Sequence, residues 1–228
     1  MANVILVVGD TGTGKSTSIQ SLDPKETYII NCANKPLPFK GSGEIYKVGS
    51  NLSEIDSSTS ILSVLETINT NAAAAHIKNL IIDDSGFIMS EIYFRKSAEK
   101  GYDKFTEIAK AYQSVLSKCK SMRANLNVAI MMHDEDMVSN GIIVGKKGKT
   151  VGKLVDDQYN PLSVVTIALF TEVSFDREGR PQYNFITNRC LRTGVIIPAK
   201  SPQGMFSSLQ VPNDLSAVFK DAREFYGN

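Results

Sequence analysis

The residues best suited to chemistry lie near the amino terminus, where an apolar run ends in a glycine-rich turn. Residues 4–8 form an unbroken, mostly β-branched run, which predicts a buried strand. Eight residues follow it: Gly9, Asp10, Thr11, Gly12, Thr13, Gly14, Lys15 and Ser16. They match G-x-x-x-x-G-K-[ST], the P-loop pattern, in which glycines let main-chain N–H groups converge on an anion. The alternative is a glycine-rich turn that matches the pattern by chance.

Each polar residue of such a loop has its own task. The Lys15 ammonium would reach the β- and γ-phosphates of a nucleoside triphosphate, and the Ser16 hydroxyl would ligate Mg²⁺. From Thr17 to Leu22 we expect a helix whose free N–H groups face the phosphates. ATP is the expected nucleotide, because Asn34-Lys35-Pro36-Leu37 begins like the guanine-specific N-K-x-D motif but lacks its acid.

Two adjacent carboxylates end a second apolar run. Residues 79–82 predict a buried strand, and Asp83 and Asp84 follow. A carboxylate at the carboxyl end of a strand lies in the crevice where open α/β sheets bind ligands. We therefore expect Asp83 to hold Mg²⁺, directly or through water, although a plain strand end before a turn is the alternative. Asp84 would either polarise the attacking water or face solvent.

A histidine and a lysine-rich stretch complete the candidates. His133 follows the apolar run 127–132 and is expected at a strand end, either as a γ-phosphate sensor or as a hydrogen-bonded loop histidine. Residues 134–157 lack periodicity and predict a flexible loop. Its lysines suit phosphate backbones, although a solvated hairpin tip is the alternative; they are Lys146, Lys147, Lys149 and Lys153. No aromatic residue lies among them, so base stacking is not expected there.

The remaining pattern predicts the elements that position these groups. We expect a strand over residues 27–31 and a short edge strand over 44–48. Helices are expected over residues 61–76, 88–100, 103–123 and 214–226, the last capped by Asn213. Residues 164–175 and 182–187 predict a hairpin, and 195–212 should be irregular. The alternation of strands and helices predicts an α/β fold with a mostly parallel sheet flanked by helices.

Composition sets the remaining bounds. A chain of 228 residues with an ordinary composition predicts one domain, with residues 163–228 as an extension of the same sheet. The net charge of +1 gives no overall field that would attract nucleic acid. Cys32, Cys119 and Cys190 are far apart and odd in number, so neither a disulfide framework nor a zinc site is expected. Without a signal peptide or membrane span, the expected location is the cytoplasm.

The order of these motifs resembles the RecA-like ATPase core. More narrowly, the chain is similar to the small bacteriophage ATP-binding proteins grouped with the Sak-type single-strand annealing recombinases. The resemblance covers nearly the whole chain. It depends on the P-loop and on Leu80-Ile81-Ile82-Asp83-Asp84, Met132-His133-Asp134-Glu135, Thr150-Val151-Gly152-Lys153, Ala199-Lys200-Ser201-Pro202-Gln203-Gly204-Met205-Phe206 and Pro212-Asn213-Asp214-Leu215.

The resemblance implies an ATPase that oligomerises on single-stranded DNA, in a ring or filament, and promotes annealing in phage recombination. A single-strand-binding protein is the implied partner. His133 would be the γ-phosphate sensor, and residues 141–153 would be the mobile DNA-binding loop. Three cations would reach a neighbouring subunit's nucleotide: Arg189, Arg192 and Lys200.

One departure from the family pattern concerns hydrolysis. RecA-like enzymes usually carry a glutamate just past the second strand, whereas this chain has Asn31-Cys32-Ala33-Asn34 there. Either Asp84 replaces the glutamate, or turnover is slow and ATP acts as a switch. A phosphotransferase such as a nucleotide kinase and a non-catalytic nucleotide-gated adaptor are the alternative functions.

Overall fold

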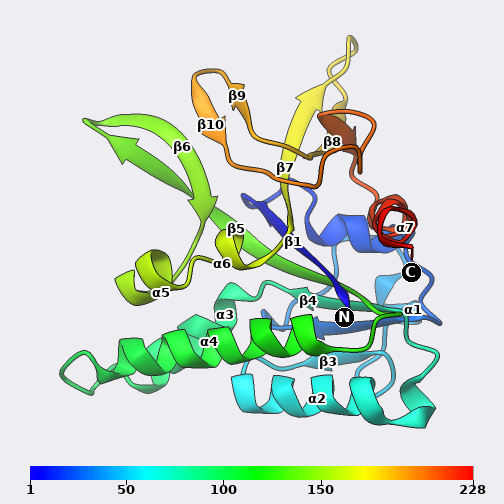
Figure 1. Ribbon diagram of the computed structural model, residues 1–228, viewed down its shortest axis with the longest axis vertical. Coiled ribbons are helices and arrows are strands. Elements are labelled where there is room, and N and C mark those ends of the chain that lie inside the picture. Colours follow the sequence, from blue (N-terminus) through cyan, green and yellow to red (C-terminus); the bar gives the residue numbers. More distant parts are fainter. Residues whose placement is uncertain (228) are drawn as a thin grey trace.

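The computed structural model describes residues 1–227; Asn228, the last residue of the predicted domain, lies outside them. Within this range eleven strands form one sheet with a main path β11-β8-β7-β1-β5-β4-β2-β3 (Figure 1). The strands of the path are β1 (Asn3–Gly9), β2 (Thr27–Asn31), β3 (Leu52–Glu54), β4 (Asn79–Asp83), β5 (Asn127–Ser139), β7 (Ile167–Phe175), β8 (Pro181–Ile186) and β11 (Gln210–Pro212). Strands β3, β2, β4, β5, β1 and β7 pair in parallel, and β8 and β11 pair antiparallel. The predicted α/β class with a mostly parallel sheet is therefore confirmed.

Helices cover both faces of this sheet. They are η1 (Ser16–Ser21), α1 (Ser42–Ile45), α2 (Ser58–Thr70), η2 (Ala72–Ala74), α3 (Gly86–Arg95), α4 (Asp103–Ser121), α5 (Lys153–Gln158), α6 (Pro161–Val164) and α7 (Leu215–Tyr226). Helices α2, α3 and α4 lie on one face, while η1 and α7 lie on the other. Among residues 1–227 no helix combines the length and apolarity that crossing a membrane requires.

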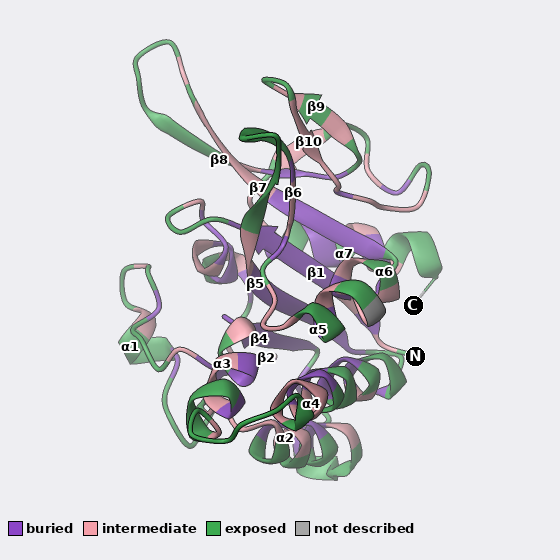
Figure 2. Ribbon diagram, turned by 90° about the vertical axis from the view of Figure 1, so that its left-hand side faces the viewer, coloured by how far each residue is buried: buried purple, intermediate pink, exposed green. Residues whose placement is uncertain are grey.

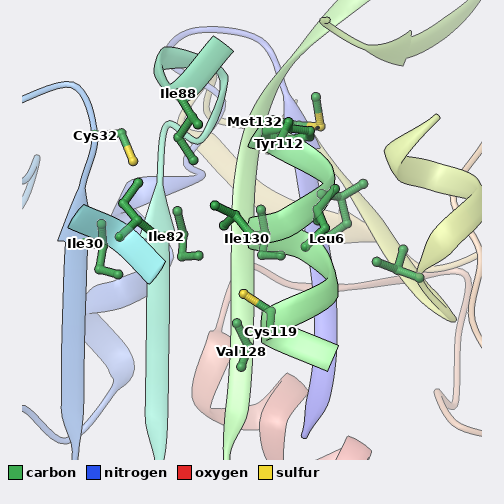
Figure 3. Close-up of a cluster of buried hydrophobic side chains, with 14 of the residues drawn as sticks. Leu6, Ile30, Cys32, Ile82, Ile88, Tyr112, Cys119, Val128, Ile130 and Met132 are labelled. Carbon is green, nitrogen blue, oxygen red and sulfur yellow. Dashed lines mark hydrogen bonds between the residues drawn. The ribbon is translucent and has the colours of Figure 1, made fainter. Parts of the chain in front are cut away.

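The core follows the alternation of the strands. On β1, Leu6 and Val8 pack against α2, α3 and α4, whereas Ile5 and Val7 face η1 and α7. The same alternation on the neighbouring strands builds two buried layers, one on each side of the sheet. Figure 3 shows the first layer, where Tyr112 from α4 meets side chains of β1, β4 and β5.

Several predicted boundaries are wrong. The edge strand is Leu52–Glu54 and not residues 44–48, because the first two residues of the predicted strand belong to the short helix α1. Strand β5 does not end at His133 but continues to Ser139 and turns into β6 (Ile142–Gly148). Asn140 and Gly141 make the turn with φ of 52° and 78°, the left-handed conformations that a two-residue hairpin favours. Most of the predicted flexible loop is therefore a β-hairpin followed by α5.

The carboxyl-terminal part also differs in detail. The predicted β7–β8 hairpin is confirmed. Residues 195–212 are not wholly irregular, because β10 (Val195–Ile197) pairs with β9 (Cys190–Arg192) and β11 adds to β8. Asp214, not Asn213, caps α7 by accepting a hydrogen bond from Ala217 N at 3.0 Å.

Candidate functional site

The glycine-rich turn lies directly after β1, at the carboxyl edge of the parallel sheet. Gly12 and Gly14 have φ of 77° and 94°, which glycine adopts without strain. A Cβ on Gly9 would overlap Thr171 Oγ1, because β7 lies against the start of the turn. Among residues 1–227, the N–H groups of Gly12 and Gly14 have no acceptor, so they are available to an anion.

The other polar residues of the turn shape it. The Thr11 N–H donates to Asp10 Oδ1 at 2.6 Å, and Thr13 Oγ1 donates to the Asp10 carbonyl at 2.7 Å. Thr17 is half-buried in η1. The expected helix is present but begins one residue earlier and is more tightly wound: η1 is a six-residue 3₁₀ helix from Ser16 to Ser21. Any anion must depend mainly on the turn itself and on Lys15.

Lys15 is buried and folds back over the turn. Its Nζ donates to the carbonyls of Gly9 and Asp10, both at 2.8 Å. Burial lowers the pKa of Lys15, whereas the carboxylates of Asp84 and Asp83 raise it. The ammonium is thus held at the rim of the turn by two main-chain acceptors, which an incoming phosphate oxygen can replace.

Ser16 and Asp83 come together as the sequence predicts. Ser16 Oγ donates to Asp83 Oδ1 at 2.9 Å, which links the turn after β1 to the end of β4. Asp83 is buried, and burial together with the charge of Asp84 raises the pKa of Asp83 to about 6. No ion pair to Asp83 occurs in the described part of the chain, so its charge lacks a cation in contact.

Asp84 has different surroundings. It does not face solvent, because its side chain is 1% exposed, and that alternative is wrong. Lys35 Nζ forms an ion pair with Oδ2, and His133 Nε2 lies 3.3 Å from Oδ1. Burial on its own would raise the pKa of Asp84, but the contacts with His133 and Lys35 outweigh it and lower the pKa to about 2. Asp84 is therefore a weak base for activating water.

His133 lies where β5 leaves the main sheet. It pairs in register with Gly9, so it is level with the start of the glycine-rich turn. Its carbonyl accepts a hydrogen bond from Lys149 N at 2.8 Å, which ties it to the end of the β5–β6 hairpin. The predicted polar group beside the turn is thus present, although within a strand and in contact with Asp84.

The described part of the chain offers too few donor atoms at this site to hold a metal ion without further oxygens from a bound ligand. Within residues 1–227, no cluster of three or more His, Cys, Asp or Glu side chains is arranged to hold a metal. Ser16 and Asp83 nevertheless supply two neighbouring oxygen donors, the type that Mg²⁺ prefers. Mg²⁺ commonly takes one or two protein oxygens and completes its shell with phosphate and water. The donor pair fits Mg²⁺ bound together with a nucleotide.

The two groups of lysines have different environments. Lys146 pairs with Asp134 at 3.1 Å and with Asp136 at 2.7 Å across the β5–β6 hairpin. Lys147 pairs with Glu135 at 3.4 Å and also with Asp156. Acidic neighbours therefore neutralise both of them at the base of the hairpin.

Lys149, in the connection between β6 and α5, and Lys153, the first residue of α5, are exposed. The start of α5 lies close to a feature that the sequence analysis missed, a group of four aromatic residues that we term the aromatic surface: Tyr93, Phe94, Tyr102 and Phe105. Phe94 is 72% and Tyr102 is 85% exposed. Figure 2 shows the chain between α3 and α4, which carries Tyr102, as exposed.

The aromatic surface carries positive charge as well. Lys104 Nζ lies 5.3 Å from the ring centroid of Tyr93 and 5.6 Å from that of Phe105. A Cβ on Gly152 would lie 2.7 Å from Phe105, so the chain leading to Lys153 packs on this surface. The alternation of aromatic residues and lysines in residues 93–105 is the signal that could have revealed it.

The three predicted trans-acting cations are not equivalent. Arg189 is exposed, whereas Lys200 is half-buried and has its pKa lowered by burial. Arg192 Nε contacts Glu172 Oε1 at 3.1 Å, and its Nη2 donates to Gln210 at 3.2 Å. Arg192 is thus engaged within its own chain.

The β8–β11 edge also contacts the glycine-rich turn. Asn213 Nδ2 donates to the Gly14 carbonyl at 3.0 Å. A Cβ on Gly14 would lie 2.9 Å from the ring of Tyr183, so this ring covers the glycine. The predicted capping residue therefore stabilises the turn from a distance of 199 residues along the chain.

Comparison with known proteins gives no relative to set beside this geometry: no protein-family model matches the chain, and no curated protein matches it.

Proposed function

We propose that the chain is a RecA-like P-loop ATPase that binds ATP with Mg²⁺ at the turn after β1. The observation that carries the proposal is the hydrogen bond between Ser16 and Asp83. A P-loop hydroxyl and a strand-end carboxylate come from different strands, and a chance glycine-rich turn has no reason to bring them into contact. The buried Lys15 at the rim of the same turn adds the cation that a triphosphate needs.

Each group then has a task in binding. The N–H groups of the turn and the Lys15 ammonium bind the phosphates. Ser16 and Asp83 hold Mg²⁺, which when bound neutralises phosphate charge. His133 is the group placed to respond to the terminal phosphate, since it is level with Gly9 and contacts Asp84.

Slow turnover follows from the state of Asp84. No acid follows β2, and the contact with His133, the largest of the influences that lower the pKa of Asp84, holds this residue as a weakly basic carboxylate. A poor base favours long-lived ATP complexes. This observation also favours the second candidate, a nucleotide-gated adaptor in which binding rather than hydrolysis matters.

Single-stranded DNA is the proposed polymer partner, bound by oligomers of the chain as in the Sak-type recombinases that it resembles. Exposed aromatic rings beside lysines suit single strands, because bases stack on the rings while ammonium groups contact phosphates. The aromatic surface, Lys149 and Lys153 therefore replace Lys146 and Lys147 as the main proposed contacts. Participation of Arg189 and Lys200 at a neighbour's nucleotide, and of a single-strand-binding protein, remains part of the proposal.

Nucleotide titration tests the central claim. A fluorescent ATP analogue should bind in the presence of Mg²⁺, and Lys15→Ala should abolish binding while circular dichroism stays unchanged. Lys25→Ala, at an exposed turn away from the site, is the matched control. Normal binding by the Lys15 variant would refute the proposal. Light scattering with ATP and an oligonucleotide then separates an assembling ATPase, which grows in mass, from a phosphotransferase.

A further inference from the structure

Lys35 is a second ammonium at the candidate site, and no role in nucleotide binding has been assigned to it above. Its side chain is 50% exposed, whereas its partner Asp84 is 1% exposed. Lys35 also acts on Lys15, because its positive charge is one of the influences that lower the pKa of Lys15, after burial. The two ammonium groups therefore lie near one another at the same edge of the sheet.

The main chain at Lys35 is fixed, although its side chain is half in solvent. Asn31 Nδ2 donates to the Lys35 carbonyl at 2.7 Å, and Cys32 N donates to the Asp83 carbonyl at 3.1 Å. Asn34 has φ of 51°, a left-handed conformation that turns the chain back toward β4. The main chain of this loop is thus fixed beside Asp83 at Cys32 and tied to Asn31 at Lys35, and only the flexible end of the Lys35 side chain can change partner.

The contact with Asp84 is suited to exchange. Within the described residues, neither carboxylate oxygen of Asp84 has a hydrogen bond of acceptable geometry, although Lys35 and His133 both lie against the carboxylate. The ammonium end of Lys35 is half-exposed, so it can change partner without leaving a buried position. Asp84 itself has φ of 52°, an unfavourable value for a residue with a side chain. His133 would remain beside Asp84 after the Lys35 side chain moved away.

We propose that Lys35 is a triphosphate-binding residue: its ammonium holds Asp84 in the free chain and transfers to the terminal phosphate of a bound nucleoside triphosphate. The inference rests on the proposed nucleotide binding. A diphosphate lacks the terminal group, so Lys35 stays with Asp84.

Binding measurements on variants test the transfer. With Mg²⁺ present, we compare the affinity for a β,γ-imido triphosphate with the affinity for ADP. A hydrogen bond between charged groups contributes ~1.5–3 kcal/mol, so Lys35→Gln should weaken triphosphate binding by about tenfold or more. ADP binding should change by less than about twofold, within the error of such comparisons. Lys35→Arg should keep the preference, and Lys40→Gln, exposed in the same loop, is the matched control.

A double variant separates transfer from simple neutralisation of Asp84. If Lys35 only cancels the charge of Asp84, Lys35→Gln leaves a repulsive carboxylate, and adding Asp84→Asn restores triphosphate binding. Under the proposal the double variant stays defective, because the lost phosphate contact is not replaced. Restored triphosphate preference in the double variant overturns the inference. Wild-type protein that binds neither nucleotide instead refutes the proposed function.

Amine acylation of the wild-type protein gives a test that needs no variant. The half-exposed Lys35 should react in the free chain, and mass spectrometry should show it protected by the imido triphosphate but not by ADP. Lys40 provides the internal reference. Equal labelling of Lys35 with both nucleotides overturns the inference.

Discussion

Replacing Asp83 by Asn should stabilise the free chain while removing its response to Mg²⁺. The pKa of Asp83 is raised from an ordinary 3.8 to about 6. The folded state therefore binds a proton more tightly than the unfolded state, and keeping Asp83 ionised above pH 6 costs free energy. About two pKa units correspond to ~3 kcal/mol, an upper bound because Asp84 titrates next to it. Asn keeps an oxygen that accepts the Ser16 hydrogen bond and carries no charge.

Urea unfolding at several pH values measures this effect. The free energy of unfolding of Asp83→Asn should exceed that of wild type most at pH 8. This difference should close as the pH falls from about 6 to 4, because Asp83 takes up its proton at a higher pH in the folded state than in the unfolded state. In a chain of this length, 1 kcal/mol corresponds to ~2–4 °C in Tm. A variant that is less stable than wild type at pH 8, or a gap independent of pH, would refute the reasoning.

Asp84→Asn is the matched control, and we expect it to change the free energy of unfolding in the opposite direction. The pKa of Asp84 is lowered to about 2, so the stability that its charge contributes is present above pH 4 and lost as the pH falls toward 2. Asp84→Asn should therefore destabilise the chain at pH 8. The two neighbouring substitutions differ by one position and should shift stability in opposite directions.

Three further predictions follow from the site. The Mg²⁺-dependent part of ATP affinity should fall as the pH drops through about 6, because the metal needs the ionised carboxylate at the end of β4; a flat profile in pH-dependent titration contradicts this. Gly9→Ala should destabilise the chain by about 3 kcal/mol, because the added Cβ would overlap β7. Gly12 has open space around it, so Gly12→Ala should cost only ~1 kcal/mol, for its left-handed φ. Equal midpoints of urea unfolding for the two variants would contradict this difference. Phe94→Ala and Tyr102→Ala should each weaken oligothymidine binding by ~1–3 kcal/mol in fluorescence anisotropy, whereas Phe175→Ala, 70% exposed on β7, should not; equal effects would exclude the aromatic surface.

The strands were the most predictable part of the fold. The apolar runs 4–8, 27–31 and 79–82 became β1, β2 and β4 within a residue or two, because a strand buried on both faces needs an unbroken apolar sequence. The β5–β6 hairpin was considered only as the alternative to a flexible loop. Its Asn140-Gly141 turn signal was visible, but the acidic and lysine residues on either side suggested a solvated loop, and only the fold pairs those charges across two strands.

The sequence predicted those residues of the candidate site that belong to a local motif, but not the contacts between residues far apart in the chain. The local pattern predicted Lys15 and Ser16, and the strand end predicted Asp83. The contact between Lys35 and Asp84 joins residues 49 positions apart, and no periodicity encodes which ammonium will reach a buried carboxylate. Such pairs depend on strand order, which brings the ends of β2, β4 and β5 together.

Asp83 and Asp84 are neighbouring carboxylates at the same edge of the sheet, but Asp84 has a cationic partner in the chain and Asp83 has none among the described residues. Both are buried and adjacent, yet their pKa values shift in opposite directions. Asp84 already contacts the Lys35 ammonium and the His133 imidazole, whereas within residues 1–227 the partner of the Asp83 carboxylate is the Ser16 hydroxyl. A buried carboxylate without a cation takes up a proton or a metal ion, and a metal ion is favoured above pH 6. The carboxylate charge without a neighbouring cation is therefore that of Asp83, beside Ser16, where a phosphate chain and Mg²⁺ would bind together. We therefore expect nucleotide and Mg²⁺ to neutralise the charge of Asp83 rather than that of Asp84.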